Sequence, residues 1–133
     1  MKVCIAGGGR VGMYLAQSLL SHHHKVTIIE PQEALCRTLA DTLDIPVICG
    51  DSLSFDTLRR GGVENCDAVA AVTEEDSVNL MAAQLAKNIF RRDKVICRVS
   101  DPHLQILYHK AYELETICPT VLTEQAVFRA LSK

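Results

Sequence analysis

Long apolar runs are absent from this chain of 133 residues, although 48% of its residues are hydrophobic. A membrane-spanning helix needs about 20 consecutive apolar residues, so the sequence predicts none. The amino terminus reaches a glycine turn directly after residues 2–6, too soon for the apolar segment of a secretion signal. We therefore expect a globular protein of the cytoplasm.

An excess of charge of one sign is also absent. Lys and Arg number 14, Asp and Glu number 16, and the formal net charge is −2. Domains that bind nucleic acid usually carry a basic stripe, and none is visible here. We therefore expect no nucleic-acid partner.

Paired metal or redox motifs are missing as well, since none of the six cysteines are spaced as C-x-x-C. Four cysteines stand in or beside apolar runs typical of strands, namely Cys4, Cys49, Cys97 and Cys118. We expect reduced thiols in the core, with a disulfide framework or a zinc site as the alternative. The adjacent residues His22–His24 cannot converge on one metal, and we expect them in a solvated turn.

The chain does contain a regular alternation of β-branched runs and segments with apolar residues at helical spacing, such as Val11, Leu15 and Leu19. The expected strands are residues 2–6, 25–30, 46–49, 68–72, 94–99 and 115–118. The expected helices are residues 10–21, 32–43, 54–60, 74–90, 102–111 and 120–131.

Six strand–helix units with short connections predict a parallel sheet with helices on both faces. Right-handed crossovers then give an α/β, Rossmann-type doubly wound sheet of six strands in the order 3-2-1-4-5-6. No linker interrupts the pattern, so residues 1–133 are expected to form a single domain with no room for a substrate domain.

The segment Gly7-Gly8-Gly9-Arg10-Val11-Gly12 joins the first strand to the first helix. In this context Gly7 permits a tight turn, Gly9 lets the backbone approach a pyrophosphate, and Gly12 allows close helix–sheet packing. The free N–H groups and the dipole of the helix start favour phosphate. The segment therefore predicts a nucleotide site, and a turn used only for packing is the alternative.

Glu30 ends the second strand roughly 20 residues beyond the loop, where an acid accepts hydrogen bonds from an adenosine ribose. It would repel a 2′-phosphate, and no arginine follows it directly. NAD(H), ATP, ADP or AMP therefore fit better than NADP. A solvated acid at a strand end is the alternative.

Two arginines are candidate phosphate ligands. Arg10 lies in the glycine loop, and Arg98 ends the fifth strand at the same edge, where it can reach the phosphates or the adenine. The alternatives are a solvated Arg10, and an ion pair of Arg98 with Asp101 or Glu74.

Two further pairs end strands at this edge. Gly50-Asp51 follows the third strand, where an adenine would lie, and Thr73-Glu74 follows the fourth, near the middle of the ligand. Asp51 and Thr73 can also cap the helices that follow. No nucleophile, acid–base pair or reactive cysteine accompanies these residues, so we expect no catalytic residue, no metal site and no enzyme.

Together these features resemble the RCK or KTN (TrkA-N) nucleotide-binding domains of Trk/Ktr potassium-transport regulators. The resemblance runs over the whole chain and rests on residues 5–12, Glu30, Gly50-Asp51, residues 67–80 and residues 96–99. The run Asp76-x-x-Asn79-Leu80 after a strand ending in Val72-Thr73 is not usual in Rossmann dehydrogenases.

The resemblance implies a cytoplasmic homodimer or larger ring, held at the inner face of the membrane by a potassium channel or transporter. It implies that NAD(H) or an adenine nucleotide gates ion flow from a site formed by Gly7–Val11, Glu30, Asp51, Thr73, Glu74 and Arg98. The last helix, from Thr120, resembles the one that packs on a partner subunit.

The sequence departs from this family in two respects. Many members have a glutamate after the proline that follows the sixth strand, and some use it to hold a divalent cation at ATP. Thr120 stands there, which puts that mode of binding in doubt, and Glu124 comes one turn later. Members often carry a second, C-terminal lobe, so we expect a lone lobe or a fragment of a longer protein.

Two other functions stay open at this point. One is an NAD-dependent oxidoreductase or its cofactor-binding fragment, which would need a substrate domain. The other is a dimerisation module with a vestigial pocket, which would bind no ligand.

Overall fold

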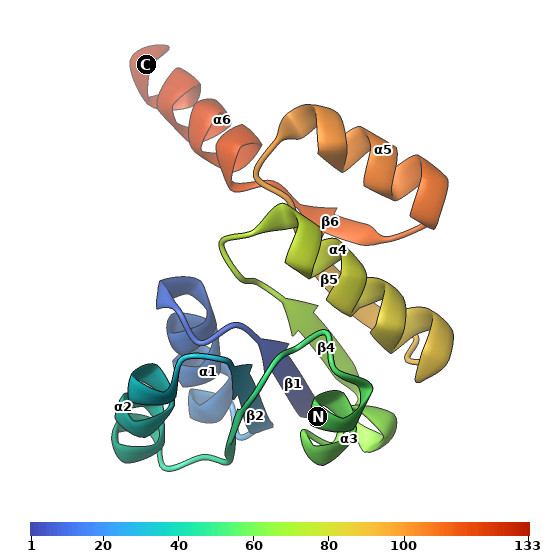
Figure 1. Ribbon diagram of the computed structural model, residues 1–133. Helices are drawn as coiled ribbons and strands as arrows, with labels where there is room; N and C mark the ends of the chain where they lie inside the picture. The colour runs from blue at the N-terminus through green and yellow to red at the C-terminus, as the bar shows by residue number, and fades with distance from the viewer.

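Six parallel strands form one sheet in the computed structural model, which describes all residues from 1 to 133 (Figure 1). Their order is β3-β2-β1-β4-β5-β6, so the predicted doubly wound sheet is confirmed. The strands are β1 (Lys2–Ala6), β2 (Lys25–Glu30), β3 (Val47–Cys49), β4 (Ala68–Ala71), β5 (Lys94–Arg98) and β6 (Glu115–Ile117).

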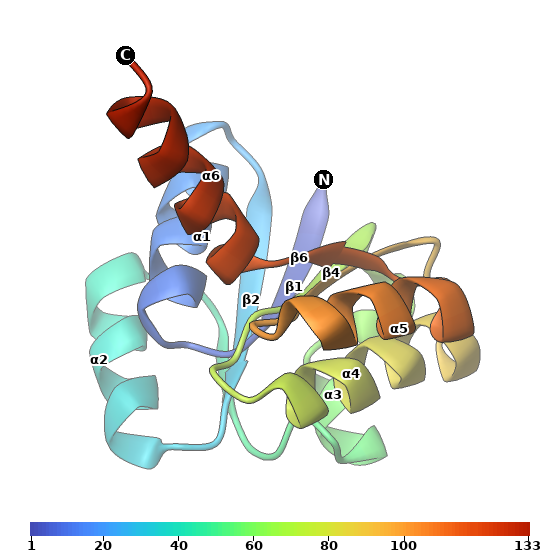
Figure 2. The same ribbon diagram turned by 90° about the horizontal axis from the view of Figure 1, so that it is seen from above.

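Helices cover both faces of this sheet. They are α1 (Arg10–Ser21), α2 (Glu33–Leu43), α3 (Phe55–Arg60), α4 (Asp76–Gln84), α5 (Pro102–Tyr112) and α6 (Pro119–Leu131). Figures 1 and 2 show α1 and α2 on one face and α3, α4 and α5 on the other. A 3-10 turn η1 (Val63–Asn65) follows α3, and a π-helical segment η2 (Leu85–Ile89) continues α4.

The core consists of two apolar layers, one on each face of the sheet. Because successive strand residues point to opposite faces, Val3 and Ile5 of β1 pack in the layer that contains Ala16 of α1. Cys4, which lies between them, packs in the other layer with Ala83 of α4. This alternation fixes which face each helix covers.

The start of α4 differs from the prediction. The helix begins at Asp76 rather than Glu74, because Thr73 folds the preceding residues into a turn in which its Oγ1 accepts a hydrogen bond from Glu75 N at 3.2 Å. The turn η1 was not predicted, since three residues carry no periodic signal.

Helix α6 contains no buried residue, and Figures 1 and 2 show it projecting from the body to the C-terminus. Four of its large apolar side chains are exposed: Leu122, Val127, Phe128 and Leu131. None of the helices combines the length and the apolar character that crossing a membrane requires.

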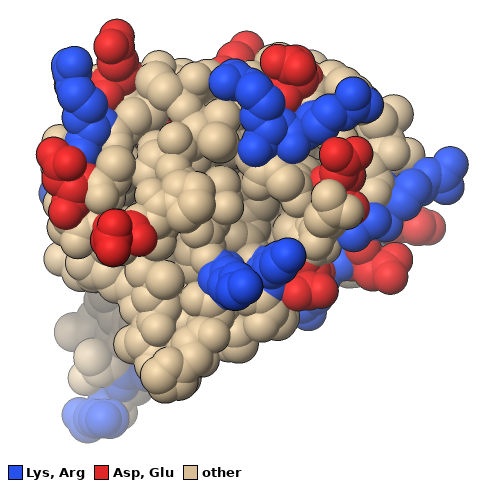
Figure 3. Space-filling view, turned by 90° about the horizontal axis from the view of Figure 1, so that it is seen from below, with Lys and Arg blue, Asp and Glu red and all other residues tan.

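Charges of both signs are interspersed on the face shown in Figure 3, around an uncharged centre. This distribution agrees with the near balance of acidic and basic residues in the sequence.

Candidate functional site

The candidate residues meet at the carboxyl edge of the sheet. Backbone hydrogen bonds continue the strand pairing just past the strand ends, from Gly7 N to Ile29 O at 2.9 Å and from Gly50 N to Glu30 O at 3.0 Å. Val72 N likewise donates to Ala6 O at 2.9 Å. The segments that follow β1, β2, β3 and β4 therefore leave the sheet at one edge, as the topology predicts.

The glycine loop needs glycine at two positions for different reasons. Gly7 has φ +114°, a conformation that side chains rarely adopt, and a Cβ there would lie 3.0 Å from Thr73 N. A Cβ on Gly12 would collide with the carbonyl oxygen of Gly7. The loop therefore folds tightly against both α1 and the end of β4.

The start of α1 is open on its outer side. Gly9 caps the helix without a side-chain hydrogen bond, and the first turn holds no acidic residue. Gly9, Arg10 and Val11 are exposed. The first N–H groups of a helix have no partner within it, so this end can donate to an anion. Arg10 takes part in no ion pair of the chain.

Glu30 is buried, with 6% of its surface exposed, and is tied to the loop. Its Oε1 accepts a hydrogen bond from Gly8 N, and its Oε2 accepts one from Gln32 N, both at 2.9 Å. A carboxylate oxygen has two lone pairs, so each oxygen keeps one for a further donor. The alternative of a solvated acid is wrong.

Asn79 joins the ends of β4 and β5, a role of its side chain that was not predicted. Its Oδ1 accepts hydrogen bonds from Thr73 N at 2.8 Å and from Thr73 Oγ1 at 2.7 Å. Its Nδ2 donates to Thr73 O at 2.9 Å and to Arg98 O at 3.0 Å. The side chain is fully buried, so these four bonds use its whole capacity. The sequence signal that could have predicted this role is a polar residue on the apolar face of a helix.

Arg98 points its guanidinium toward the turn after β4. Its Nη1 donates to Thr73 O at 3.3 Å, and its buried Nε has no partner. The expected alternative of an ion pair with Asp101 or Glu74 is wrong, because the three ion pairs of the chain lie elsewhere. A buried N–H without an acceptor is costly.

Asp76 was also missed as a positioning residue. Its Oδ1 accepts a hydrogen bond from Ser100 N at 2.8 Å, and its Oδ2 accepts one from Asp101 N at 3.3 Å. The first turn of α4 is thereby fixed to the loop after β5.

The remaining candidates lie at the rim. Asp51 is exposed and accepts a hydrogen bond from Leu53 N at 2.9 Å. It does not cap α3, because Ser54 does so through Thr57 N. Gly50 is half-buried, and Glu74 is exposed in the turn before α4. Thr73 is not the cap of α4 either, since Glu75 holds that position.

All six cysteines are free, and the chain has no group of three or more His, Cys, Asp or Glu side chains arranged to hold a metal. Burial raises the pKa of the Cys4 and Cys97 thiols to about 12. Cys49, expected in the core, is exposed, because β3 is a three-residue strand at the edge of the sheet. His22 and His23 are exposed in the turn after α1.

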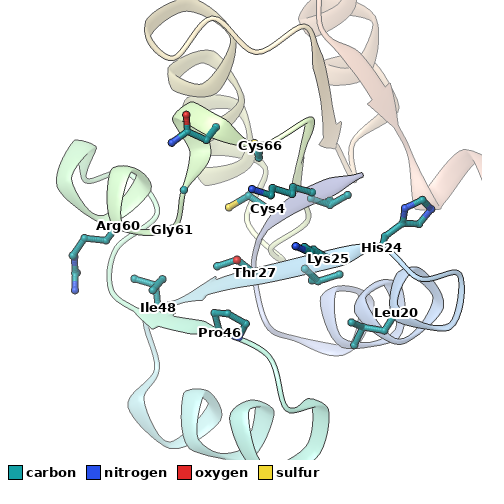
Figure 4. Close-up of a pocket in the computed structure, with 15 residues that line it drawn as sticks. Cys4, Leu20, His24, Lys25, Thr27, Pro46, Ile48, Arg60, Gly61 and Cys66 are labelled. Atoms are coloured by element: carbon teal, nitrogen blue, oxygen red, sulfur yellow. The ribbon is translucent and has the colours of Figure 1, made fainter.

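A cavity of about 600 Å³ lies apart from this edge, where β1 and β2 begin (Figure 4). Lys25, Thr27 and Cys4 reach it from the sheet, and Arg60 and Cys66 reach it from the segments after β3. None of the predicted site residues lines it. The candidate site lies instead at the carboxyl ends of the strands, where the glycine loop contacts Glu30.

Residues 3–119 match the TrkA-N domain family. The chain belongs to this family. The match covers most of the chain, including the glycine loop and the Thr73–Leu80 segment, and confirms the resemblance found in the sequence.

Curated TrkA-N relatives are named for potassium uptake. The chain is 41% identical over 110 residues to a Trk system potassium uptake protein TrkA homolog of Methanothermobacter thermautotrophicus, covering 83% of this chain and 50% of the relative. It is 31% identical over 136 residues to one of Pyrococcus abyssi, covering 98% of this chain and 60% of the relative. The chain thus spans only about half the length of these relatives. These names are not those of enzymes.

Solved structures share the fold at low identity. The TrkA-N domain of the inner membrane protein ybaL from Escherichia coli has a TM-score of 0.88 at 14% identity, over 98% of this chain and 96% of that one. The AMP-bound Kef C-terminal domain of Shewanella denitrificans has a TM-score of 0.82 at 19% identity, over 99% and 80%. The NAD-bound GsuK channel has a TM-score of 0.75 at 16% identity, over 89% and 21%.

Proposed function

We propose that this TrkA-N domain senses NAD(H) or an adenine nucleotide and thereby regulates a potassium channel or transporter. The observation that carries the proposal is the Glu30 carboxylate, held by the Gly8 amide beside an open helix start. This arrangement offers a ribose acceptor next to a phosphate donor, as dinucleotide-binding folds do.

Each part of a nucleotide has a candidate contact at this edge. The N–H groups from Gly9 to Gly12 and the Arg10 side chain would contact the phosphates, and Glu30 would contact the ribose hydroxyls. Gly50-Asp51 would lie near the adenine. Thr73, Glu74 and Arg98 would lie near the middle of the ligand, with the charge of the Arg98 guanidinium facing the turn after β4.

The ligands of structural neighbours support this class of molecule. The Kef domain holds AMP and the GsuK channel holds NAD, and both share this fold. Both ligands contain an adenosine with a free 2′-hydroxyl, which suits an acid at the position of Glu30. NADP suits it poorly.

We infer that ATP binds without a bridging divalent cation at Thr120. The Thr120 Oγ1 donates a hydrogen bond to Ser100 O at 2.6 Å, so this hydroxyl holds a loop and offers no carboxylate to a metal. Adding Mg²⁺ should then leave the affinity for ATP unchanged, apart from its effect on the free nucleotide.

We propose that α6 packs on a second copy of the chain, giving a cytoplasmic homodimer or larger ring attached to its membrane partner. The helix leaves Leu122, Val127, Phe128 and Leu131 exposed, an apolar surface that suits a protein interface. A nucleotide regulates such an assembly only if it binds one of its states more tightly than another. Phe128→Glu should shift light-scattering mass toward the monomer, and an unchanged oligomer would show that α6 lies outside the interface.

A thermal-shift panel tests the ligand directly. NADH, NAD⁺, ATP, ADP and AMP at millimolar concentration should raise the melting temperature, since a ligand at about 100 times its Kd stabilises by about 2.7 kcal/mol. Nicotinamide and inorganic phosphate serve as controls for the separate parts of the ligand. The proposal fails if all five nucleotides leave the melting temperature unchanged.

A further inference from the structure

Two cysteines lie side by side at the edge of the candidate site. Cys36 is on the first turns of α2 and is buried, whereas Cys49 ends β3 and is exposed. In the pairing of β2 with β3, Cys49 is the Cα partner of Glu30. Residues from α2 and β3 thus meet behind the proposed ribose acceptor.

Two hydrogen bonds define the position of the two sulfur atoms. Cys36 Sγ donates to Glu30 O at 3.1 Å, and Cys49 Sγ donates to Pro31 O at 3.9 Å. The Cys36 and Cys49 thiols are also close enough to influence each other's charge. Because their acceptors are consecutive carbonyls, both sulfurs are fixed against the same turn of the chain.

The two thiols differ in accessibility. Burial, and next the neighbouring Cys49 thiol, raises the pKa of Cys36 to about 12. Cys36 is therefore a neutral thiol near neutral pH, shielded from reagents. Cys49 is the sulfur that an oxidant in solution reaches. An accessible thiol next to a second, resolving thiol is the arrangement that forms disulfides reversibly.

We propose that Cys36 and Cys49 form a reversible disulfide that weakens nucleotide binding at the Glu30 edge. The oxidant is a low-molecular-weight disulfide. The Cys49 thiolate attacks one sulfur of it and displaces one thiolate, which takes up a proton, leaving a mixed disulfide on Cys49. The Cys36 thiol loses its proton to solvent and attacks Cys49 Sγ, and the second small thiolate leaves and is protonated. The two cysteines lose two electrons in all, and the small disulfide is reduced to two thiols.

The link to the nucleotide rests on the function proposed above. Oxidation removes the S–H donors from the carbonyls of Glu30 and Pro31 and joins α2 covalently to β3. The Glu30 carboxylate is held by the amides of Gly8 and Gln32, so a shift of this turn changes the direction in which it faces the ribose. We expect nucleotide affinity to fall by about three- to tenfold, the effect of weakening one or two hydrogen bonds.

Oxidation of the full chain by glutathione tests the disulfide itself. The protein is equilibrated in mixtures of oxidised and reduced glutathione, quenched with acid, alkylated and mapped by peptide mass spectrometry. We expect a Cys36–Cys49 crosslink that dithiothreitol reverses and that forms faster as pH rises. Cys66→Ser is the matched control, because serine keeps the hydrogen bond to Val63 O and leaves the pair intact. Cys49→Ser, at an exposed position, should abolish the crosslink without unfolding the chain.

Three results would overturn the disulfide: no crosslink, a stable glutathione adduct on Cys49, or a crosslink between other cysteines. Calorimetry with AMP then tests the coupling in the reduced and oxidised chain, with Cys49→Ser exposed to the same glutathione mixtures. Equal affinity in both states overturns the coupling. If the reduced chain binds no adenine nucleotide at all, the proposed function fails and the coupling fails with it, whereas the crosslink result stands separately.

Discussion

Glu30 and Gly8 are joined by a hydrogen bond of 2.9 Å from the Gly8 amide to Glu30 Oε1, across the carboxyl ends of β1 and β2. The bond holds a buried carboxylate at a fixed distance from the start of α1. Because the second oxygen is held by Gln32 N, neither oxygen is free to rotate away from the site. A ligand would meet an acceptor that needs no rearrangement, which lowers the entropic cost of binding.

Two glycine variants separate folding from binding. Gly12→Ala should destabilise the domain by about 2 kcal/mol or more, because its Cβ collides with the Gly7 carbonyl. Gly9→Ala should leave stability unchanged within about 0.5 kcal/mol, since no atom lies within 4 Å of the added Cβ. It should still weaken NAD⁺ binding by about tenfold, because the methyl group occupies the approach to the phosphates. Chemical denaturation measures the stability of the two variants, and calorimetry measures their NAD⁺ affinity. Full affinity in Gly9→Ala would show that the ligand binds elsewhere.

Arg10→Ala should weaken ligands with two or three phosphates by about tenfold, the effect of losing one charge-assisted hydrogen bond. AMP, with one phosphate, should lose less. Equal losses for AMP, ADP and ATP would show that Arg10 does not contact the outer phosphates. Arg59→Ala serves as the control, since Arg59 is exposed over the Phe55 ring on α3.

Asn79→Ala should lower the free energy of unfolding by about 3 kcal/mol, because it leaves several groups of Thr73 and Arg98 without partners. Urea denaturation measures this loss. Asn88→Ala is the matched control at an exposed position of η2 and should have little effect. Similar values for the two variants would show that the buried network contributes nothing to stability.

Alkaline pH should destabilise the domain through its buried thiols. The pKa of Cys4 and Cys97 rises from 9.0 to about 12 on folding, so between these values the unfolded chain has lost protons that the folded chain keeps. Stability is then complete below pH 9 and falls as pH rises, by up to about 1.4 kcal/mol per pH unit for each thiol.

The double variant Cys4→Ala/Cys97→Ala tests this. It should be less stable than the natural chain at pH 7, yet lose less stability between pH 9 and 11. Parallel decreases in the two proteins would mean that other groups cause the alkaline loss.

The sheet and the glycine loop could be predicted because they rest on local signals. Apolar periodicity indicates each strand and helix, and the segment Gly7–Gly12 connects the first strand to the first helix. The start of α4 could not be predicted from local signals, since it depends on the contact between Thr73 and Asn79. The hydrogen-bond partner of Arg98 could not be predicted either, because long-range packing turns its guanidinium toward the Thr73 carbonyl and away from Asp101.

The exposure of Cys49 shows a further limit. Its apolar neighbours predict a buried strand, but burial depends on the position of β3 at the edge of the sheet. The order of strands and a short third strand over residues 46–49 were predicted, yet the exposure of Cys49 was not; all three residues of β3 pair with β2. The same feature places an exposed thiol beside Glu30.

The most direct measurement compares NAD⁺ and NADP⁺ by calorimetry in the natural chain and in Glu30→Ala. The natural chain should bind NAD⁺ and discriminate against NADP⁺ by about tenfold or more, because a 2′-phosphate would face a buried carboxylate. Glu30→Ala should bind NAD⁺ more weakly and lose the discrimination. Unchanged NAD⁺ affinity in Glu30→Ala, or no binding of either dinucleotide or of AMP by the natural chain, would contradict the account.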